Sequence, residues 1–186
     1  MTNTSLFFSI NNLAGHSVWL DRLGIFFADY SGYIILAILV LILFSRPSVA
    51  ARRMVVVASV SAIISRGIVT TAIRFLYYHS RPFTALHVNQ LIPESGASFP
   101  SGHAAFYFAI AMAVYLYNKK LGISFFVISL LMGLARIYAG VHWPADVVGG
   151  LVVGVVTALL IDFFIRKFVE KTKLPIGEFI TKDLVS

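Results

Sequence analysis

Three short polar stretches interrupt a mostly apolar chain, and their side chains are of the types that bind and attack a phosphate. The positions singled out in them below offer three guanidiniums, two imidazoles and one carboxylate. Guanidiniums match the geometry of phosphate oxygens, and an imidazole can act as a nucleophile or as a general acid. The three stretches are residues 74–82, 100–103 and 136–146. This combination predicts a site that transfers a phosphoryl group.

The first stretch places Arg74 and Arg81 seven residues apart. On a continuous helix that spacing is about 10 Å of rise, which is long for two groups that share one phosphate. Pro82 disfavours the helical conformation for the residue before it, so we expect the helix to end near residues 79–80. Arg81 could then turn back towards Arg74. For either arginine alone, an interfacial side chain that snorkels to water is the competing interpretation.

The second stretch, Pro100-Ser101-Gly102-His103, comes directly before a long apolar run. Serine is a favoured N-cap, so a helix is expected to start here with its free amides facing the loop region. Such a helix start attracts anions, and Gly102 would let an anion approach the backbone closely. His103 adds a titratable group beside it. A plain helix start with an interfacial histidine is the alternative.

The third stretch holds His142 and Asp146 four residues apart, with Pro144 between them. Proline suits the first turn of a helix, so we expect a helix to start there and Asp146 to accept a hydrogen bond from His142. A carboxylate on one ring nitrogen fixes the tautomer and leaves the other nitrogen as a nucleophile. Arg136 is expected across the same loop, at the end of the preceding helix. A His–Asp pair that only caps a helix is the alternative.

The composition predicts a single integral membrane domain over residues 1–186. Hydrophobic residues make up 59% of the chain, charged residues only 12%, and the mean hydropathy is +0.87. A soluble domain cannot bury that much apolar surface. The net charge is +7, but the basic residues cluster at the ends of apolar segments, which indicates membrane topology and not nucleic-acid binding. The chain has no cysteine, which excludes disulfides and thiolate metal sites.

The apolar segments predict an all-α, polytopic bundle of five to six transmembrane helices within residues 24–168, since about 20 residues cross the hydrocarbon core. Residues 1–22 are too polar to span and are expected to form an interfacial segment, although a span over residues 3–20 would give the sixth helix. Residues 82–99 should form a loop and residues 169–186 a cytoplasmic tail. The five expected spans are residues 24–44, 54–78, 101–117, 121–135 and 147–168.

The basic residues also predict the orientation of the bundle. Ten of the fifteen Lys and Arg residues fall on one side, which the positive-inside rule places in the cytoplasm. All three polar stretches then lie at the opposite, extracytoplasmic face. The ten residues are Arg46, Arg52, Arg53, Lys119, Lys120, Arg166, Lys167, Lys171, Lys173 and Lys182.

With these motifs the sequence resembles the PAP2 (type 2 phosphatidic acid phosphatase) superfamily. That family's pattern is Lys-x6-Arg-Pro, then Pro-Ser-Gly-His, then Ser-Arg-x5-His-x3-Asp, and all three spacings match. Two positions depart: Arg74 stands where the family has Lys, and Ala135 stands where it has Ser. The first keeps the charge but replaces a point charge by a planar fork, and the second removes a hydroxyl that could bind phosphate. Both departures bear on substrate preference and rate.

The resemblance implies a role for each matching residue. His142 would attack phosphorus and form a phosphohistidine, with Asp146 orienting it. His103 would protonate the leaving group and later help to activate water. No metal or cofactor is expected, because guanidiniums supply the positive charge. The residues implied to hold the phosphoryl oxygens are Arg74, Arg81, Arg136, Ser101 and Gly102.

Within the superfamily the chain is similar to the bacitracin-resistance type of undecaprenyl diphosphate phosphatase, since Arg81-Pro82-Phe83 and residues 98–101 fit that branch. The expected partner is a membrane lipid, a polyprenyl diphosphate, whose hydrolysis recycles the carrier for cell-wall synthesis. Phosphatidic acid, phosphatidylglycerol phosphate and lipid A are alternative substrates. A haloperoxidase-like vanadate binder and a non-enzymatic lipid phosphate binder or transporter are alternatives of other classes.

Several polar residues outside the motifs also carry expectations. Asp29 and Arg66 lie within spans and could pair with each other, or each could meet another polar group, with substrate gating as an alternative role for Asp29. Asp162 is expected to be solvated or to pair with Arg166 at i+4. Three residues near the motifs are expected to be solvated loop residues: His79, His87 and Glu94.

Overall fold

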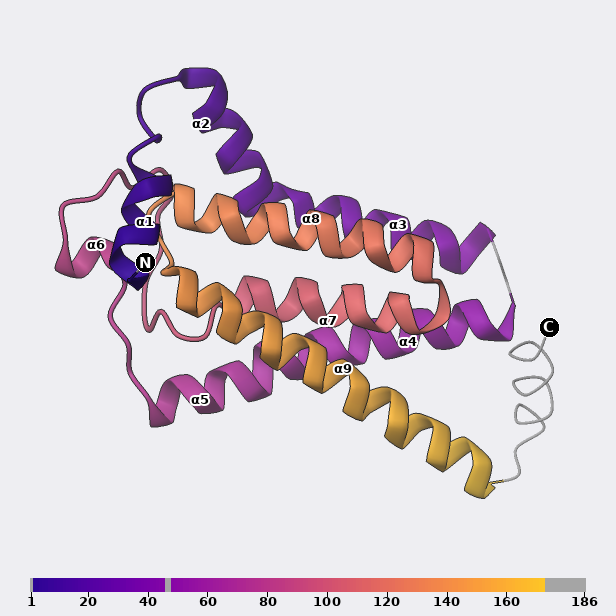
Figure 1. Ribbon diagram of the computed structural model, residues 1–186. Coiled ribbons are helices and arrows are strands. Elements are labelled where there is room, and N and C mark those ends of the chain that lie inside the picture. Colours follow the sequence, from indigo (N-terminus) through magenta and orange to yellow (C-terminus); the bar gives the residue numbers. More distant parts are fainter. Residues whose placement is uncertain (1, 46–47, 173–186) are drawn as a thin grey trace.

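A computed structural model describes residues 2–45 and 48–172, and every regular element in this part of the chain is a helix (Figure 1). Four stretches are long and apolar enough to cross a membrane, which confirms the predicted all-α, multi-pass bundle. The elements are α1 (Asn3–Asn11), α2 (Val18–Ile25), the π-helical turn η1 (Phe26–Tyr30), α3 (Ser31–Ser45), α4 (Val49–Ile63), the π-helical turn η2 (Ile64–Val69), α5 (Thr70–Leu76), α6 (Pro82–Ala85), α7 (Gly102–Tyr117), α8 (Lys119–Tyr138) and α9 (Pro144–Thr172).

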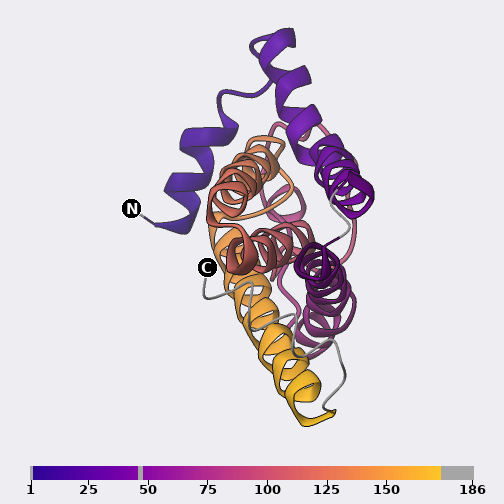
Figure 2. The same cartoon turned by 90° about the vertical axis from the view of Figure 1, so that its right-hand side faces the viewer.

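Helix α7 is the centre of the bundle and packs against α4, α8 and α9 (Figure 2). Only 16 residues long, it starts farther into the bundle than the end of α8 and the start of α9, which lie at the same end of the molecule (Figure 1). Small residues bring α9 close to it. A Cβ added to Gly150 would lie 2.6 Å from the Ser101 carbonyl oxygen, and one added to Gly154 would lie 2.5 Å from that of Ala105. This close crossing fixes the start of α7 against the first turns of α9.

The N-terminal segment covers one end of the bundle. Helix α1 has nine residues, too few to cross a membrane, and it packs on α8 and α9. Its buried Asn11 side chain donates hydrogen bonds to the carbonyls of Asn89 (2.9 Å) and Tyr138 (2.8 Å). The helix that carries the first span begins at Val18, earlier than the predicted start at residue 24, because the Ser17 hydroxyl caps it.

Two helix starts agree with the sequence predictions, and other helix ends differ from them. Ser101 caps α7, and α9 begins at Pro144, both as expected. The second span ends at Leu76, so the predicted ends at residue 78 and, from Pro82, near residues 79–80 are wrong, because Tyr77 is already extended. Helix α9 continues past residue 168 to Thr172. Residues 173–186 of the predicted tail lie outside the described residues.

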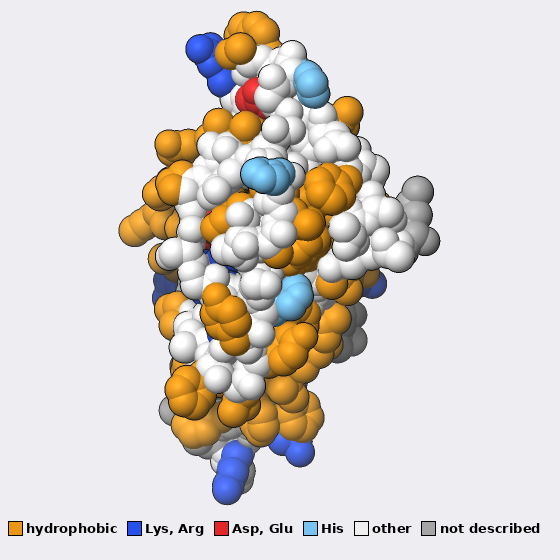
Figure 3. Space-filling view, turned by 90° about the vertical axis from the view of Figure 1, so that its left-hand side faces the viewer, with side chains coloured by type: hydrophobic (Ala, Val, Ile, Leu, Met, Phe, Trp, Pro, Cys, Tyr) orange, Lys and Arg blue, Asp and Glu red, His pale blue; other side chains and the backbone are white. Residues whose placement is uncertain are grey.

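The two ends of the bundle differ in charge. The α7–α8 turn, the start of α4 and the end of α9 meet at one end, and the three polar stretches lie at the other (Figure 1). The surface at the end that holds the three polar stretches is mainly uncharged and carries a few histidine side chains (Figure 3). Of the ten basic residues predicted on the cytoplasmic side, seven fall at the first end, while Arg46, Lys173 and Lys182 lie outside the described residues.

Candidate active site

The three polar stretches converge on one cavity of about 280 Å³. Both imidazoles of the motifs, His103 and His142, line it together with two of the three motif arginines. The first span contributes none of its lining. The lining residues are Arg66, Gly67, Thr70, Thr71, Arg74, Arg81, Glu94, Ser95, Gly102, His103 and His142.

His142 and Asp146 form the predicted pair at the start of α9. The Nδ1 atom of His142 lies 3.3 Å from Oδ2 of Asp146, and both side chains are almost completely buried. The same Oδ2 accepts a hydrogen bond from the Trp143 amide (2.8 Å) and a short one from the Ser98 hydroxyl. These contacts fix the carboxylate, so the proton of the imidazole belongs on Nδ1 and the lone pair on Nε2.

The surroundings of His142 keep it neutral. Burial, together with the positive charges of Arg136 and Arg81, lowers its pKa to about 4, although the hydrogen bond that the imidazole donates to Asp146 acts in the opposite direction. At neutral pH the imidazole is therefore uncharged, and Nε2 can donate its lone pair. This is the state that a nucleophilic histidine requires.

Arg81 is buried beside that nitrogen. Its backbone is extended because Pro82 follows, as predicted, and α6 starts directly after it. The side chain donates to the carbonyls of Gly96 (3.0 Å) and Val141 (2.9 Å), and Nη1 lies 3.4 Å from Nε2 of His142. Burial lowers the pKa of Arg81, whereas the charge of a neighbouring carboxylate raises it. The guanidinium stays charged, since the normal pKa of arginine lies far above neutrality.

Arg136 is held at the end of α8 by two carboxylates. Its Nη1 lies 3.0 Å from Oδ1 of Asp29, which comes from η1. Its Nη2 makes a short contact with Glu94. Of the two possibilities predicted for Asp29, pairing with Arg66 is therefore wrong, and contact with another polar group, Arg136, is confirmed. Arg136 itself is 1% exposed and does not line the cavity.

Glu94 is a site residue that the sequence reasoning missed. Its Oε2 accepts hydrogen bonds from both Arg81 (3.3 Å) and Arg136, so the prediction of a solvated loop residue is wrong. Its carboxylate lines the cavity between two guanidiniums, the environment in which a phosphate oxygen would be bound. The one signal in the sequence was an acidic residue within a loop that joins two basic motifs.

His79 is also closer to the site than predicted. Its Nδ1 lies 3.4 Å from Oδ1 of Asp146, although the two atoms lack hydrogen-bond geometry. The ring stacks on Tyr77 with 6.2 Å between the centroids. His79 therefore lies beside Asp146, the carboxylate partner of His142. His87, in contrast, is exposed, as expected for a loop residue.

The start of α7 brings Arg74 and His103 together. Arg74 donates from Nε (3.2 Å) and Nη2 (2.9 Å) to the Pro100 carbonyl, directly before the helix. A Cβ added to Gly102 would lie 3.8 Å from Nη2 of Arg74. Ser101 is buried, and its hydroxyl accepts the capping hydrogen bond from the Ala104 amide (3.4 Å). Gly102 thus lies at the cavity wall, whereas Ser101 supports the helix start behind it.

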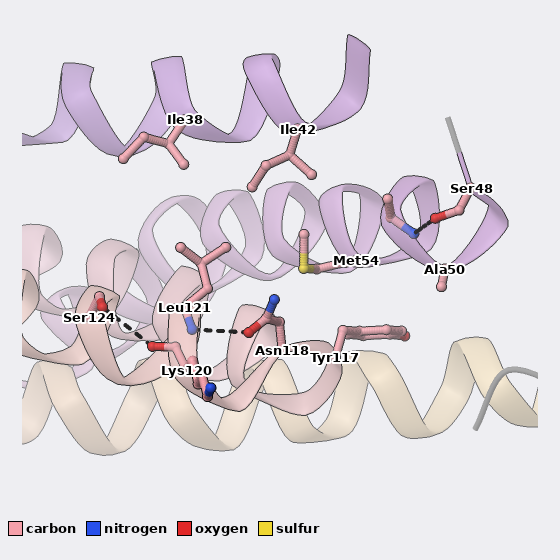
Figure 4. A pocket seen from close by; sticks show the side chains of 11 residues that line it. Ile38, Ile42, Ser48, Ala50, Met54, Tyr117, Asn118, Lys120, Leu121 and Ser124 are labelled. Carbon is pink, nitrogen blue, oxygen red and sulfur yellow. Dashed lines mark hydrogen bonds between the residues drawn. The ribbon is translucent and has the colours of Figure 1, made fainter. Parts of the chain in front are cut away.

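A second hollow, of about 610 Å³, lies at the opposite end of the bundle between α3, α4 and the α7–α8 turn (Figure 4). Aliphatic side chains such as Ile38, Ile42, Met54 and Leu121 form much of its wall. No histidine or carboxylate lines it. The groups needed for phosphoryl transfer are therefore gathered only in the first cavity among the hollows described.

Comparison with known proteins agrees with this geometry. Residues 55–169 match the model of the PAP2 superfamily. The chain is 33% identical to undecaprenyl-diphosphatase BcrC of Bacillus subtilis, over 90% of this chain and 88% of that protein. The chain belongs to the PAP2 superfamily. This PAP2 protein is therefore a membrane-embedded phosphatase, a hydrolase, as the motifs predicted.

Solved structures share the fold of this PAP2 phosphatase. LpxE of Aquifex aeolicus superposes with a TM-score of 0.72 at 31% identity, covering 86% of this chain and 93% of that one. A PAP2-type phosphatidylglycerolphosphate phosphatase of Bacillus subtilis superposes with a TM-score of 0.58 at 25% identity, covering 88% and 86% of the two chains. The helical arrangement described above is thus that of membrane PAP2 phosphatases.

Proposed function

We propose that the protein hydrolyses undecaprenyl diphosphate to undecaprenyl phosphate and inorganic phosphate. The observation that carries the reaction is the neutral, buried His142, whose Nε2 lies 3.4 Å from Arg81 in a cavity lined with arginines. Similarity over most of the chain to an undecaprenyl-diphosphatase supports the choice of lipid.

In the first step, the Nε2 lone pair of His142 attacks the terminal phosphorus. The bond between that phosphorus and the bridging oxygen breaks, and its electron pair stays on the bridging oxygen. Undecaprenyl phosphate leaves, with His103 as the proton donor. Arg74 and Arg81 line the cavity and balance the charge on the phosphoryl oxygens, Arg136 adds positive charge from outside the lining, and the amide of Gly102 adds a donor at the start of α7. Ser101 acts by capping that helix.

In the second step, His103 takes a proton from water, and the water oxygen attacks the phosphohistidine. The P–N bond breaks, its electron pair returns to Nε2, and inorganic phosphate is released. Asp146 stabilises the His142 imidazole through Nδ1 in both steps. Positive charge from guanidiniums replaces the Lewis acid that many phosphatases use, so activity in EDTA is expected.

The proposed function also includes an orientation. We place the cavity at the extracytoplasmic face, because the end of the bundle opposite the cavity carries Arg52, Arg53, Lys119 and Lys120. The substrate is then a lipid of the outer leaflet. The same geometry fits other lipid phosphates, and the similarity to a phosphatidylglycerolphosphate phosphatase keeps that lipid as the second candidate.

The test is release of inorganic phosphate by purified protein in detergent with EDTA. Undecaprenyl diphosphate is compared with phosphatidylglycerol phosphate, phosphatidic acid and lipid A. His142→Ala should abolish release, a loss of more than about 10³-fold. His87→Ala, which alters an exposed histidine of a nearby loop, is the matched control. Full activity in His142→Ala would refute the assigned nucleophile, and a faster rate on another lipid would replace the substrate.

A further inference from the structure

One helical face supplies five of the residues that line the cavity. They recur at i, i+1, i+4, i+5 and i+8 along η2 and α5, which is the spacing of a single face. Only the last of them belongs to a sequence motif. The five are Arg66, Gly67, Thr70, Thr71 and Arg74.

Arg66 reaches the same point of the cavity as Arg74. A Cβ added to Gly102 would lie 3.7 Å from Cγ of Arg66 and 3.8 Å from Nη2 of Arg74. Arg66 is exposed, and within residues 2–45 and 48–172 no hydrogen bond or ion pair is found for its guanidinium; Asp29, the other charged residue expected at this depth, pairs with Arg136. A charged side chain within a membrane span is costly and is usually kept for a function. Arg66 therefore adds an uncommitted positive charge to the cavity.

Thr70, between the two arginines, has a hydroxyl with no partner. The residue is 2% exposed, and its Oγ1 is buried without a hydrogen bond to any described residue. Its Cγ2 would lie 3.8 Å from a Cβ on Gly102, so it flanks the same glycine. Leaving a buried hydroxyl without a hydrogen bond is destabilising. A ligand oxygen in the cavity would satisfy it.

The five lining residues of this helical face also extend in one direction along the helix axis. Arg66 precedes Arg74 by eight residues, which corresponds to about 12 Å along a helix and leads away from the polar-stretch end, into the membrane. The start of α7, which faces this row, is itself recessed into the bundle (Figure 1). The cavity therefore continues from the motif arginines towards the depth at which a lipid chain would lie.

We propose that Arg66 and Thr70 bind the second phosphate of a lipid diphosphate, the one that remains attached to the hydrocarbon chain. This inference rests on the proposed function, since it assigns a site for the part of the substrate that does not react. The terminal phosphate binds at Arg74, Arg81 and His142, and the second phosphate, being joined to the apolar chain, lies on the membrane side.

The chemistry of the leaving group gives Arg66 a specific effect. When the anhydride bond breaks, the electron pair moves onto the bridging oxygen, and the negative charge of the departing phosphate increases. A guanidinium beside that group stabilises this charge more in the transition state than in the bound substrate. A monophosphate lipid has no second phosphate. Arg66 should therefore matter for diphosphates and not for monophosphates.

The experiment uses two substrates that differ only in one phosphate, farnesyl diphosphate and farnesyl phosphate. Arg66→Gln should lower kcat/KM on the diphosphate about 10- to 100-fold more than on the monophosphate, as expected for loss of a charged hydrogen bond. Arg66→Lys should recover part of the loss, and Thr70→Val should show a smaller loss of the same kind. Arg52→Gln, at an exposed position at the opposite end, is the matched control.

Inhibition gives a second measurement that needs no turnover difference between substrates. Arg66→Gln should weaken inhibition by methylene diphosphonate about tenfold and leave inhibition by orthophosphate unchanged. An equal loss on both substrates, or unchanged diphosphonate inhibition in a variant with wild-type thermal stability, would overturn the second-phosphate site. If the wild-type protein cleaves no lipid diphosphate, the proposed function fails instead, and binding of the diphosphonate still tests Arg66.

Discussion

The two ends of the bundle each place an arginine against a carboxylate, but only one of them makes a reactive site. At the end away from the cavity, Asp162 accepts hydrogen bonds from the Tyr117 hydroxyl (2.6 Å) and from Nε of Arg166 (2.6 Å). This confirms the pairing of Asp162 with Arg166 that the i+4 spacing predicted. Both carboxylate oxygens are satisfied there, so the cluster serves to join α7 to α9.

At the cavity end, the arginines outnumber the carboxylates that pair with them. Glu94 is shared between two arginines, and Arg66 and Arg74 have no carboxylate partner among the described residues. An unpartnered arginine alone does not define a site, since Nε and Nη2 of Arg53 are also buried without hydrogen bonds at the far end. The difference is that the cavity combines excess positive charge with a neutral imidazole and with space for an anion.

The largest effect is expected when the carboxylate charge at the cavity end is removed; the matching change at the far end, at Asp162, is described last. Asp146→Asn should lower kcat about 10²- to 10⁴-fold, because an amide holds the wrong tautomer of His142. Kinetics of phosphate release and trapping of the phosphohistidine would measure the effect. A loss of less than tenfold would show that Asp146 only supports the helix, as Asp162 does.

The pH dependence sharpens the comparison through His142. Its pKa is lowered to about 4, so the reactive neutral form persists as pH falls from 7 to 5 and is lost only as pH falls through about 4. We therefore expect the acid limb of kcat/KM that belongs to this imidazole near pH 4. The ionisation of the substrate phosphate is measured separately and subtracted. An enzyme limb near 6.5 would mean that His142 titrates like a solvated histidine.

Glu94 offers a test in the opposite direction. Glu94→Gln should strengthen inhibition by orthophosphate about 3- to 10-fold, because Arg81 and Arg136 lose the fixed carboxylate that competes with the anion. The inhibition constant is measured against the same lipid substrate. Glu170→Gln, at an exposed position near the end of α9, is the control. Weaker inhibition would instead show that Glu94 positions the two arginines.

The smallest effect on activity is expected at the far end. Asp162→Asn should leave kcat/KM within about twofold of wild type. The free energy of unfolding should fall by about 1–2 kcal/mol, since the hydrogen bonds from Tyr117 and Arg166 weaken. Thermal unfolding in detergent would measure this change. A tenfold loss of activity would mean that the two ends are coupled.

The sequence was informative where local rules decide the structure. Ser101 and Pro144 fixed the starts of two helices, and Pro82 fixed the extended backbone of Arg81. With these ends in place, the motif spacings predicted that His103 and His142 share one cavity. Each of these outcomes depends on a few neighbouring residues.

The sequence failed where contacts depend on the path of a loop or the rotation of a helix. Glu94 meets Arg136 across 42 residues, and the loop after α6, residues 86–99, has no periodicity from which to infer this contact. Ser98 was not recognised as a partner of Asp146 for the same reason. Shared depth left two possibilities for Asp29 and Arg66, a pair with each other or contacts with other polar groups, because which way each side chain faces depends on the packing of whole helices.

The π-helical turn η2 divides one long helix into a part that packs in the bundle and a part that lines the cavity. Before it, α4 buries Met54, Val57, Ala58 and Ser61 in the bundle; after it, Thr70 and Arg74 line the cavity. Such a wide turn accommodates one extra residue and changes the phase of everything that follows by about 100°. Deleting a single residue there would keep the span hydrophobic, yet it would turn one of these surfaces away from its neighbour. Insertion and deletion, more than substitution, would therefore decide whether this helix can be both a wall of the bundle and a wall of the site.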